Sequence, residues 1–208
     1  IAKSIEDYPA NKNFGNPEAE TYQEDIYVGY RYFETLAKDK VLYPFGYGLS
    51  YTNFEIAKKS FSYDFPNINL EIEVKNTGKY SGKEVVQCYL GLPQGKLGKP
   101  EKTLCGFKKT KLLAPNEKQT LAIKIDIKDF SSYDDLGLTG KADVSVLEEG
   151  KYQVFVGNSV RDSKIFGEFD LEKLFIVKEH YNAMSPQKDY ARFHNANGKL
   201  EMEDVKGI

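Results

Sequence analysis

The sequence contains no tryptophan and only two cysteines, Cys88 and Cys105. Two cysteines exclude a small fold held together by several disulfides. One bridge between them stays open, although we favour two free thiols buried in strands, because cysteine packs as a small hydrophobic residue. Neither sign of charge dominates, since 29 basic and 31 acidic side chains give a net charge of −2. A nucleic acid or an anionic membrane surface is therefore not expected as a partner.

Long hydrophobic runs are also missing, and no apolar stretch approaches the length of a membrane span. Residues 1–15 are polar and do not resemble a signal peptide. The sequence has no initiator methionine, which indicates that further sequence precedes it. It also contains no Asn-X-Ser/Thr acceptor, so glycosylation gives no sign of secretion. The location stays unassigned, with the cytoplasm slightly favoured over secretion or the periplasm.

What the sequence does contain is a regular succession of short apolar segments. Hydrophobic residues make up 40% and charged residues 29%, a composition typical of a folded domain. Between residues 54 and 171, segments with alternating apolar residues are separated by turn residues. About seven strands in this length predict a mainly β fold, an immunoglobulin-like sandwich. Connections of variable length favour the sandwich over an up-and-down barrel, which also fits the alternation. The residues expected on the inward faces include Leu70, Ile72, Val74, Val86, Leu121, Ile123, Val154 and Val156.

The segments on either side have other patterns. Apolar residues alternate over 26–32, which predicts a strand, and a short helical turn is expected at 33–38. Residues 43–54 combine aromatic residues with glycine and proline and cannot form a regular helix. We expect them to form a buried junction, because so much aromatic surface is costly to leave in water. Residues 172–208 are expected to be a tail or linker with a short helix, or the connection to a further domain.

Three parts of the sequence follow known motifs in their usual order. TYQEDIYVGYRYFE at 21–34 follows the pattern Tyr-x-Glu-Gly-[Ile/Leu]-x-Val-Gly-Tyr-Arg-Tyr, with Asp25 in place of the first glycine. YPFGYGLSYTNFE at 43–55 follows Phe-Pro-Phe-Gly-x-Gly-Leu-Ser-Tyr-Thr-x-Phe, with Tyr43 as the only notable departure. Segments between 74 and 162, among them VKNTGKYSGKEVVQCYL, are similar to a fibronectin type III-like domain. Most of the chain thus resembles the C-terminal part of a family 3 glycoside hydrolase of the β-glucosidase or β-xylosidase type.

This resemblance implies a domain arrangement. Residues 1–53 would be the end of an α/β domain with an interdomain loop, and residues 54–171 the fibronectin type III-like β-sandwich. The fold expected for the chain is therefore mainly β, preceded by a remnant of an α/β domain.

The resemblance also implies a reaction for the parent protein. Retaining, exo-acting β-glycosidases, with β-glucosidase favoured here, use a carboxylate nucleophile and an acid/base carboxyl group. In the family the nucleophile lies in a Ser-Asp-Trp-type motif, which this chain lacks, and the acid/base glutamate lies upstream of the matched segments. The chain is therefore expected to contribute no catalytic residue and to support the catalytic domains structurally. A stand-alone carbohydrate- or protein-binding β-sandwich module is the alternative.

The implied partners are the remaining catalytic domains of the same glycosidase and its oligosaccharide or glycoside substrate, and a homo-oligomer stays open. Glu24, Tyr43, Phe45 and Tyr47 are substrate-proximal candidates, because the aromatic rings could stack on sugar faces and Glu24 lies in a matched motif. The interpretations we favour are a structural ion pair between Glu24 and Arg31 and packing of the rings between domains. No cofactor is implied.

Other groups capable of chemistry are not expected to form a site. His180 and His194 have no cysteine nearby and predict no zinc site, so no metal is expected. The neighbouring carboxylates are expected to be solvated surface or turn residues, since adjacent strand residues point to opposite faces: Asp134 and Asp135, Glu148 and Glu149, and Glu201 and Glu203.

Overall fold

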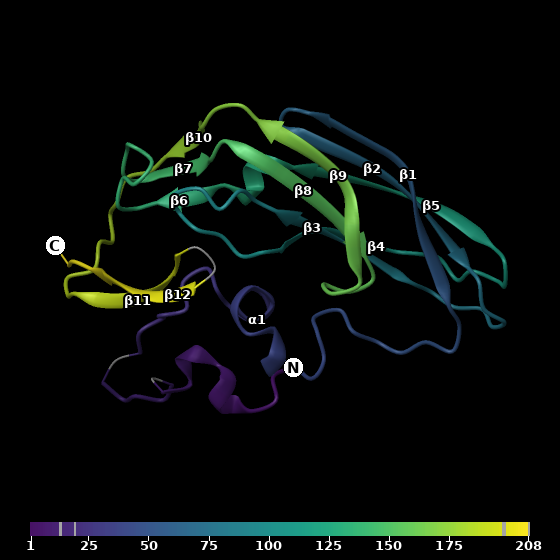
Figure 1. Cartoon of the computed structure of the whole chain (residues 1–208), viewed down its shortest axis with the longest axis horizontal. Helices are drawn as coiled ribbons and strands as arrows, with labels where there is room; N and C mark the ends of the chain where they lie inside the picture. The colour runs from purple at the N-terminus through teal and green to yellow at the C-terminus, as the bar shows by residue number, and fades with distance from the viewer. Residues whose placement is uncertain (13, 19, 197–198, 208) are drawn as a thin grey trace.

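The structure, a computed structural model, describes residues 1–12, 14–18, 20–196 and 199–207. Figure 1 shows a β-sandwich with the N-terminal segment and a small hairpin gathered beneath one end of it. The helical elements are η1 (Ile5–Asp7), η2 (Pro9–Lys12), α1 (Tyr30–Leu36), η3 (Lys38–Lys40) and η4 (Ile127–Phe130). The strands are β1 (Phe54–Asp64), β2 (Asn67–Asn76), β3 (Val85–Gly91), β4 (Thr103–Lys109), β5 (Lys118–Asp126), β6 (Ser132–Asp134), β7 (Val144–Leu147), β8 (Gly150–Gly157), β9 (Ser163–Leu171), β10 (Phe175–Glu179), β11 (Tyr190–Ala196) and β12 (Lys199–Val205).

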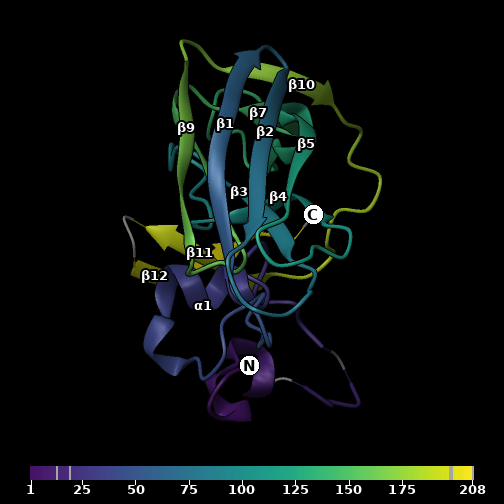
Figure 2. The same cartoon turned by 90° about the vertical axis from the view of Figure 1, so that its right-hand side faces the viewer.

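Two antiparallel sheets form the sandwich. One has the strand order β1-β2-β5 and the other the order β4-β3-β8-β9. Figure 2, turned by 90°, shows β1 and β2 in front of the sheet that holds β3 and β4. Because the sheets are separate among the described residues, the fold is a sandwich and not a closed barrel.

The core lies between the two sheets, on the faces that the alternation predicts. Ile72 on β2 and Val86 on β3 are completely buried, and the intervening charged residues such as Glu71 face outward. A slip of one residue would have turned every apolar side chain outward, so the register was strongly specified by the pattern. The prediction is confirmed for all eight inward residues, which belong to one buried cluster: Leu70, Ile72, Val74, Val86, Leu121, Ile123, Val154 and Val156.

Both cysteines belong to this sandwich and are free thiols. Cys88 on β3 is buried in the core, and Cys105 on β4 packs against it. Burial raises the pKa of the Cys88 thiol to about 12. The thiol therefore stays protonated at neutral pH and packs as a small hydrophobic group.

The strand predicted over residues 26–32 is wrong, because α1 begins at Tyr30. Gly29 has a φ of 60° and interrupts the extended run just before the helix. From Tyr30 onward the side chains at helical spacing, Phe33 and Ala37, are buried. Together with Ala2 they form a small second cluster that holds the N-terminal segment together. The apolar residues of this segment fit both a strand and a helix, and the helical spacing of the buried residues determines the local structure.

The short helix expected within residues 172–208 is also absent from the described part of that segment. β10 pairs with β7, with Phe175 opposite Leu147, and β11 pairs with β12 as a hairpin. The aromatic and β-branched residues of β10 favour this extended pairing. β10, which follows residue 171, thus forms one sheet with β6 and β7. The division of the chain into domains at residues 53 and 171 stays a prediction.

Candidate functional site

The candidate residues Tyr43, Phe45 and Tyr47 lie in an irregular loop between η3 and β1, which we call the aromatic loop (residues 43–51). The amino group of Ile1 donates to the Tyr43 carbonyl over 2.6 Å, and Tyr47 N donates to the Pro44 carbonyl over 3.1 Å. The rings of Tyr43 and Tyr47 lie next to each other, with centroids 5.1 Å apart. The structure therefore brings three of the four sequence candidates together in one turn.

Phe45 anchors this loop to the sandwich. Its ring stacks on Tyr30 of α1 at a centroid distance of 4.7 Å, and its carbonyl accepts a hydrogen bond of 3.0 Å from Val160 N. The next residue, Gly46, has a φ of 84°, and a Cβ there would lie 2.4 Å from Nε2 of Gln87. Only glycine fits both the left-handed backbone and the close approach.

The expectation that this loop is buried is wrong for the described chain. Tyr43, Phe45 and Tyr47 are 49%, 44% and 51% exposed, and Tyr51 is 97% exposed. Hydrogen bonds from Ile1 and Val160 hold the loop backbone, but the described chain supplies no residues that cover the outer side of the loop. Rings with one face packed and the other open form a surface suited to binding rather than to catalysis.

Glu24 is not part of this surface. It lies in the turn before α1, where its carbonyl accepts a hydrogen bond of 2.8 Å from Tyr27 N. Among the described contacts none joins Glu24 to the aromatic loop. The neighbouring Asp25 has a φ of 48°, a conformation that favours glycine. This explains in physical terms why the matched motif has a glycine where this chain has aspartate.

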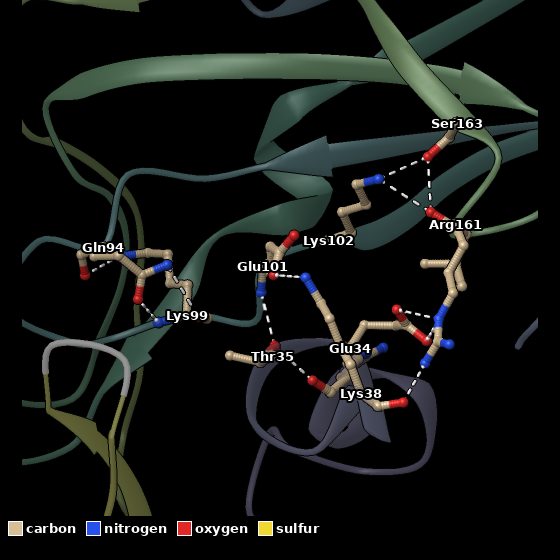
Figure 3. A network of polar contacts seen from close by, with 11 residues as sticks. Glu34, Thr35, Lys38, Gln94, Lys99, Glu101, Lys102, Arg161 and Ser163 are labelled. Atoms are coloured by element: carbon tan, nitrogen blue, oxygen red, sulfur yellow. Dashed lines mark hydrogen bonds and ion pairs between the residues drawn. The ribbon is translucent and has the colours of Figure 1, made fainter. Parts of the chain in front are cut away.

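The ion pair expected between Glu24 and Arg31 is likewise not among the described contacts, and the nearby Glu34 has a partner far away in the sequence. Nε of Arg161, in the loop before β9, lies 3.0 Å from both carboxylate oxygens of the buried Glu34. Nη2 of Arg161 donates to the Lys38 carbonyl over 2.8 Å. Figure 3 shows this network joining α1 to the sandwich. Sequence spacing could not reveal the pair, because 127 residues separate its members.

Three further contacts join the region of α1 to the segment around β4. Nζ of Lys38 lies 2.7 Å from Glu101, and both side chains are about half exposed. Glu101 N also donates to the hydroxyl of Thr35 over 2.9 Å, and Leu104 N donates to the hydroxyl of Tyr30 over 2.7 Å. The helix α1 is therefore held to the sandwich by contacts along its length.

The carboxylates expected in solvent are largely engaged. Glu148 is buried and pairs with the buried Lys99, and it accepts a hydrogen bond of 2.7 Å from Lys96 N. Asp135 and Glu203 both bind Arg192. Glu148 and Asp135 directly follow strands β7 and β6, where the chain turns. Glu203 lies within β12, opposite Arg192 on β11, so its partner is a cross-strand neighbour.

Asp134 is completely buried and caps the loop that follows β6. It accepts hydrogen bonds from Leu138 N (2.9 Å), Thr139 N (2.7 Å) and the Thr139 hydroxyl (2.6 Å). Burial raises the pKa of Asp134, but the hydrogen bonds from Thr139 and Leu138 outweigh it and hold the pKa below its usual value.

This lowered pKa gives a pH-dependent contribution to stability. A carboxyl whose folded pKa is depressed stabilises fully above its unfolded pKa of about 3.9 and loses that effect as the pH falls through the folded pKa. We expect Asp134→Asn to lower the free energy of unfolding at neutral pH by about 1–3 kcal/mol. The difference in free energy of unfolding between this variant and the unsubstituted chain should become smaller below about pH 4. Urea unfolding across this range measures it, with the exposed Asp170→Asn as control; a difference independent of pH would contradict it.

Two further kinds of feature concern metal-ligating groups and membrane-spanning helices. Among the described residues no group of three or more His, Cys, Asp or Glu side chains is placed to hold a metal ion. No helix in the described part of the chain is long and apolar enough to cross a membrane. His180 is exposed and lies 2.7 Å from the Ser145 hydroxyl.

Comparisons with known proteins agree with the fold and with the motifs. The fibronectin type III-like domain family matches residues 84–160. A β-glucosidase of Ruminococcus albus is 47% identical over 205 residues, which cover 99% of this chain and 22% of that protein. β-Glucosidase A of Butyrivibrio fibrisolvens is 46% identical over 89% of this chain and 25% of its own length.

Solved structures give the same result. A β-glucosidase from Paenibacillus barengoltzii superimposes on the whole chain with a TM-score of 0.95 and 42% identity, over 24% of its own length. β-Glucosidase 3B from Thermotoga neapolitana, solved in complex with α-D-glucose, covers 85% of the chain with a TM-score of 0.76 and 36% identity. The chain thus spans about a quarter of these proteins or less. It belongs to the family 3 glycoside hydrolases and corresponds to a part of their β-glucosidases that contains the fibronectin type III-like domain.

Proposed function

We propose that this chain is the non-catalytic portion of a retaining, exo-acting β-glycosidase, a β-glucosidase in the first instance, and that it supports the catalytic domains structurally. The observation that carries the proposal is the match over 99% of the chain to only 22% of the Ruminococcus albus β-glucosidase. The remaining domains of such a protein are the partner, and terminal β-linked sugars are the substrate class of the parent. A homo-oligomer of the parent stays a prediction.

The aromatic loop supports this role. Ile1 and Val160 anchor its backbone and Tyr30 stacks on its Phe45 ring. Tyr51 and the neighbouring Leu49, in contrast, are almost fully exposed. A contiguous apolar surface on a rigid support is typical of an interface. We therefore propose that the loop packs against the rest of the parent enzyme. Tyr43, Phe45 and Tyr47, and less directly Glu24, then lie near its substrate pocket.

The test compares the same substitution in two contexts. In the 208-residue chain, Tyr51→Ala should change the free energy of unfolding by less than about 0.5 kcal/mol, because the side chain is 97% exposed. In the whole parent enzyme, where the ring would be buried at an interface, the loss should exceed about 1 kcal/mol. Thermal or urea unfolding of both proteins measures this loss, with Tyr181→Ala, at a side chain that is 90% exposed, as the matched control.

Other outcomes separate the alternatives. Equal, negligible effects in both contexts would refute the interface. A loss of activity without a loss of stability in Tyr43, Phe45 or Tyr47 variants of the whole enzyme would instead support direct contact with sugar.

The isolated chain should release no nitrophenol from a nitrophenyl β-glucoside above a heat-killed control. Turnover there would overturn the non-catalytic assignment.

A further inference from the structure

A cavity in the described part of the chain lies away from the aromatic loop. It has a volume of about 420 Å³ and is enclosed by four parts of the chain: the turn before α1, the loop before β4, the region from η4 through β6 and the hairpin β11–β12. In Figure 1 the hairpin lies beneath β6 and beside α1, and its residues Arg192, Phe193 and Glu203 line the cavity. Phe193 N in the hairpin donates to the Gln23 carbonyl over 2.7 Å and ties the two walls together.

Arg192 organises the polar part of the cavity wall. Its Nη1 and Nη2 atoms bind the two carboxylate oxygens of Asp135 over 2.7 and 3.0 Å, and its Nε binds Glu203 over 2.9 Å. A carboxylate oxygen of Asp25 lies 3.9 Å from Nη1. Side-chain exposures of 16% for Arg192 and about 25% for Asp135 and Glu203 show that the group is largely shielded from solvent. The guanidinium therefore holds three carboxylates in fixed positions around one space.

These carboxylates keep capacity for a ligand. A carboxylate has about four lone-pair positions, and Arg192 uses one on each oxygen of Asp135 and one on Glu203. The remaining positions are hydrogen-bond acceptors at sites that need no reorganisation on binding. Such a site suits a ligand that offers several hydroxyl donors. The charged residues in the lining are Asp25, Asp129, Asp135, Glu203, Arg31, Lys99 and Arg192. Because both signs of charge are present in nearly equal number, the lining favours a neutral ligand over an anion or a cation.

The rest of the wall combines apolar, aromatic and hydroxylated side chains with Arg31, Lys99, Asp129 and His194. Tyr133 and Phe193 contribute rings, Leu97 and Leu138 contribute apolar surface, and Thr103 contributes a hydroxyl. Apolar surface combined with fixed polar groups is typical of small-molecule sites of about 300–1,000 Å³. Hydroxyl donors on the edges and C–H groups on the faces are the chemistry of a neutral sugar.

We propose that this cavity binds a neutral saccharide of about one or two sugar units. The carboxylates of Asp135, Glu203 and Asp25 accept hydrogen bonds from its hydroxyl groups, and the rings of Tyr133 and Phe193 contact its apolar face. The choice of glucose and cellobiose as probes rests on the proposed function. The binding itself is a property of this chain and does not depend on the activity of the parent enzyme.

The experiment titrates glucose and cellobiose into the 208-residue chain and follows backbone amide signals by NMR. We expect saturable shifts centred on residues of the hairpin and of β6, with a Kd on the order of 1 mM for a ligand of this size. Because the ligand is neutral, its affinity should not fall with added salt. The affinity of an organic cation attracted by the carboxylates would fall as salt screens that attraction.

Two pairs of variants locate the site. Leu138→Trp should block the cavity and weaken binding at least about tenfold, whereas Leu112→Trp, on an exposed leucine outside the cavity lining, should leave it within about twofold. Glu203→Gln keeps the shape but removes the charge, and it should weaken binding more than the exposed Glu201→Gln on the same strand.

Three results would overturn the proposal: no shifts with either sugar, equal effects of a cavity variant and its control, or affinity that falls with salt. A failure here would leave the proposed function intact, since that is tested on the stability and activity of the whole enzyme. Conversely, sugar binding by this chain would stand even if the aromatic loop proved to be no interface.

Discussion

Replacing Glu148 with alanine is expected to lower the free energy of unfolding of the chain by about 3–5 kcal/mol, the usual cost of breaking a buried ion pair from one side. Glu148 and Lys99 have side chains only 5% and 3% exposed. Burial lowers the pKa of Lys99, an effect that the Glu148 carboxylate opposes. Without that carboxylate, Lys99 would be left as an uncompensated cation in the interior.

The carboxylate also organises the loop between β3 and β4. It accepts hydrogen bonds from Lys96 N and Leu97 N, and a Cβ at Gly95 would lie 2.3 Å from its Oε1. Removing it leaves these donors without their acceptor as well as the lysine without its partner.

Urea unfolding of the chain measures the effect, and the adjacent Glu149→Ala is the matched control. Glu149 is exposed, so its loss should change stability by less than about 0.5 kcal/mol. Replacing Lys99 with Met and Glu148 with Leu together should recover much of the loss, because no unpaired charge then remains. Equal effects of the two glutamate variants would contradict the buried pair.

The second large effect is expected from Arg161→Met, which should destabilise the chain by about 2–3 kcal/mol. This change leaves the carboxylate of Glu34 without its counter-ion, and that side chain is only 5% exposed. The value is below that for Glu148 because the Arg161 side chain is 37% exposed and its charge is partly screened by water. The loss should appear first as opening of α1 from the sandwich.

Hydrogen exchange of α1 amides provides the specific measurement. Protection of Phe33 N and Ala37 N, which bond to the carbonyls of Gly29 and Phe33, should fall more than protection in β2. Lys38→Met is the matched control, because it removes a half-exposed bridge across the same interface and should cost less than about 1 kcal/mol. Adding Glu34→Gln to Arg161→Met should restore part of the stability by removing the unpaired charge. A uniform loss of protection over the whole chain would argue against a local role in docking α1.

The strand pattern of the sandwich could be predicted because it depends on neighbours in the sequence. Residues such as Leu70 and Ile72 alternate with charged residues, and a sheet with one buried face accepts only one register for that pattern. The same local argument failed at residues 26–32, where the alternation coincides with a helical spacing. Gly29 and the burial of Phe33 decided between the two periods.

The aromatic loop shows a different limit. Its motif identified the family. The close approach expected at its glycines is found at Gly46, against Gln87, but not at Gly48, where an added Cβ would meet no atom within 4 Å. Whether its rings are buried depends on what lies on the outer side of Tyr43 and Tyr51, and the described chain places nothing there. Hydrophobicity in a sequence indicates that a surface is costly to expose, but it does not specify which partner covers it.

The β-sandwich, its inward faces and the family could be predicted from the residues alone, because each depends on short-range periodicity or on contiguous motifs. Which charges meet became clear only in the folded chain: Arg161 pairs with Glu34, Lys99 with Glu148, and Arg192 with Asp135. Each of these pairs joins residues at least 49 positions apart. A charged side chain has many equivalent partners along a chain, and only the packing of the apolar core selects the one that it reaches.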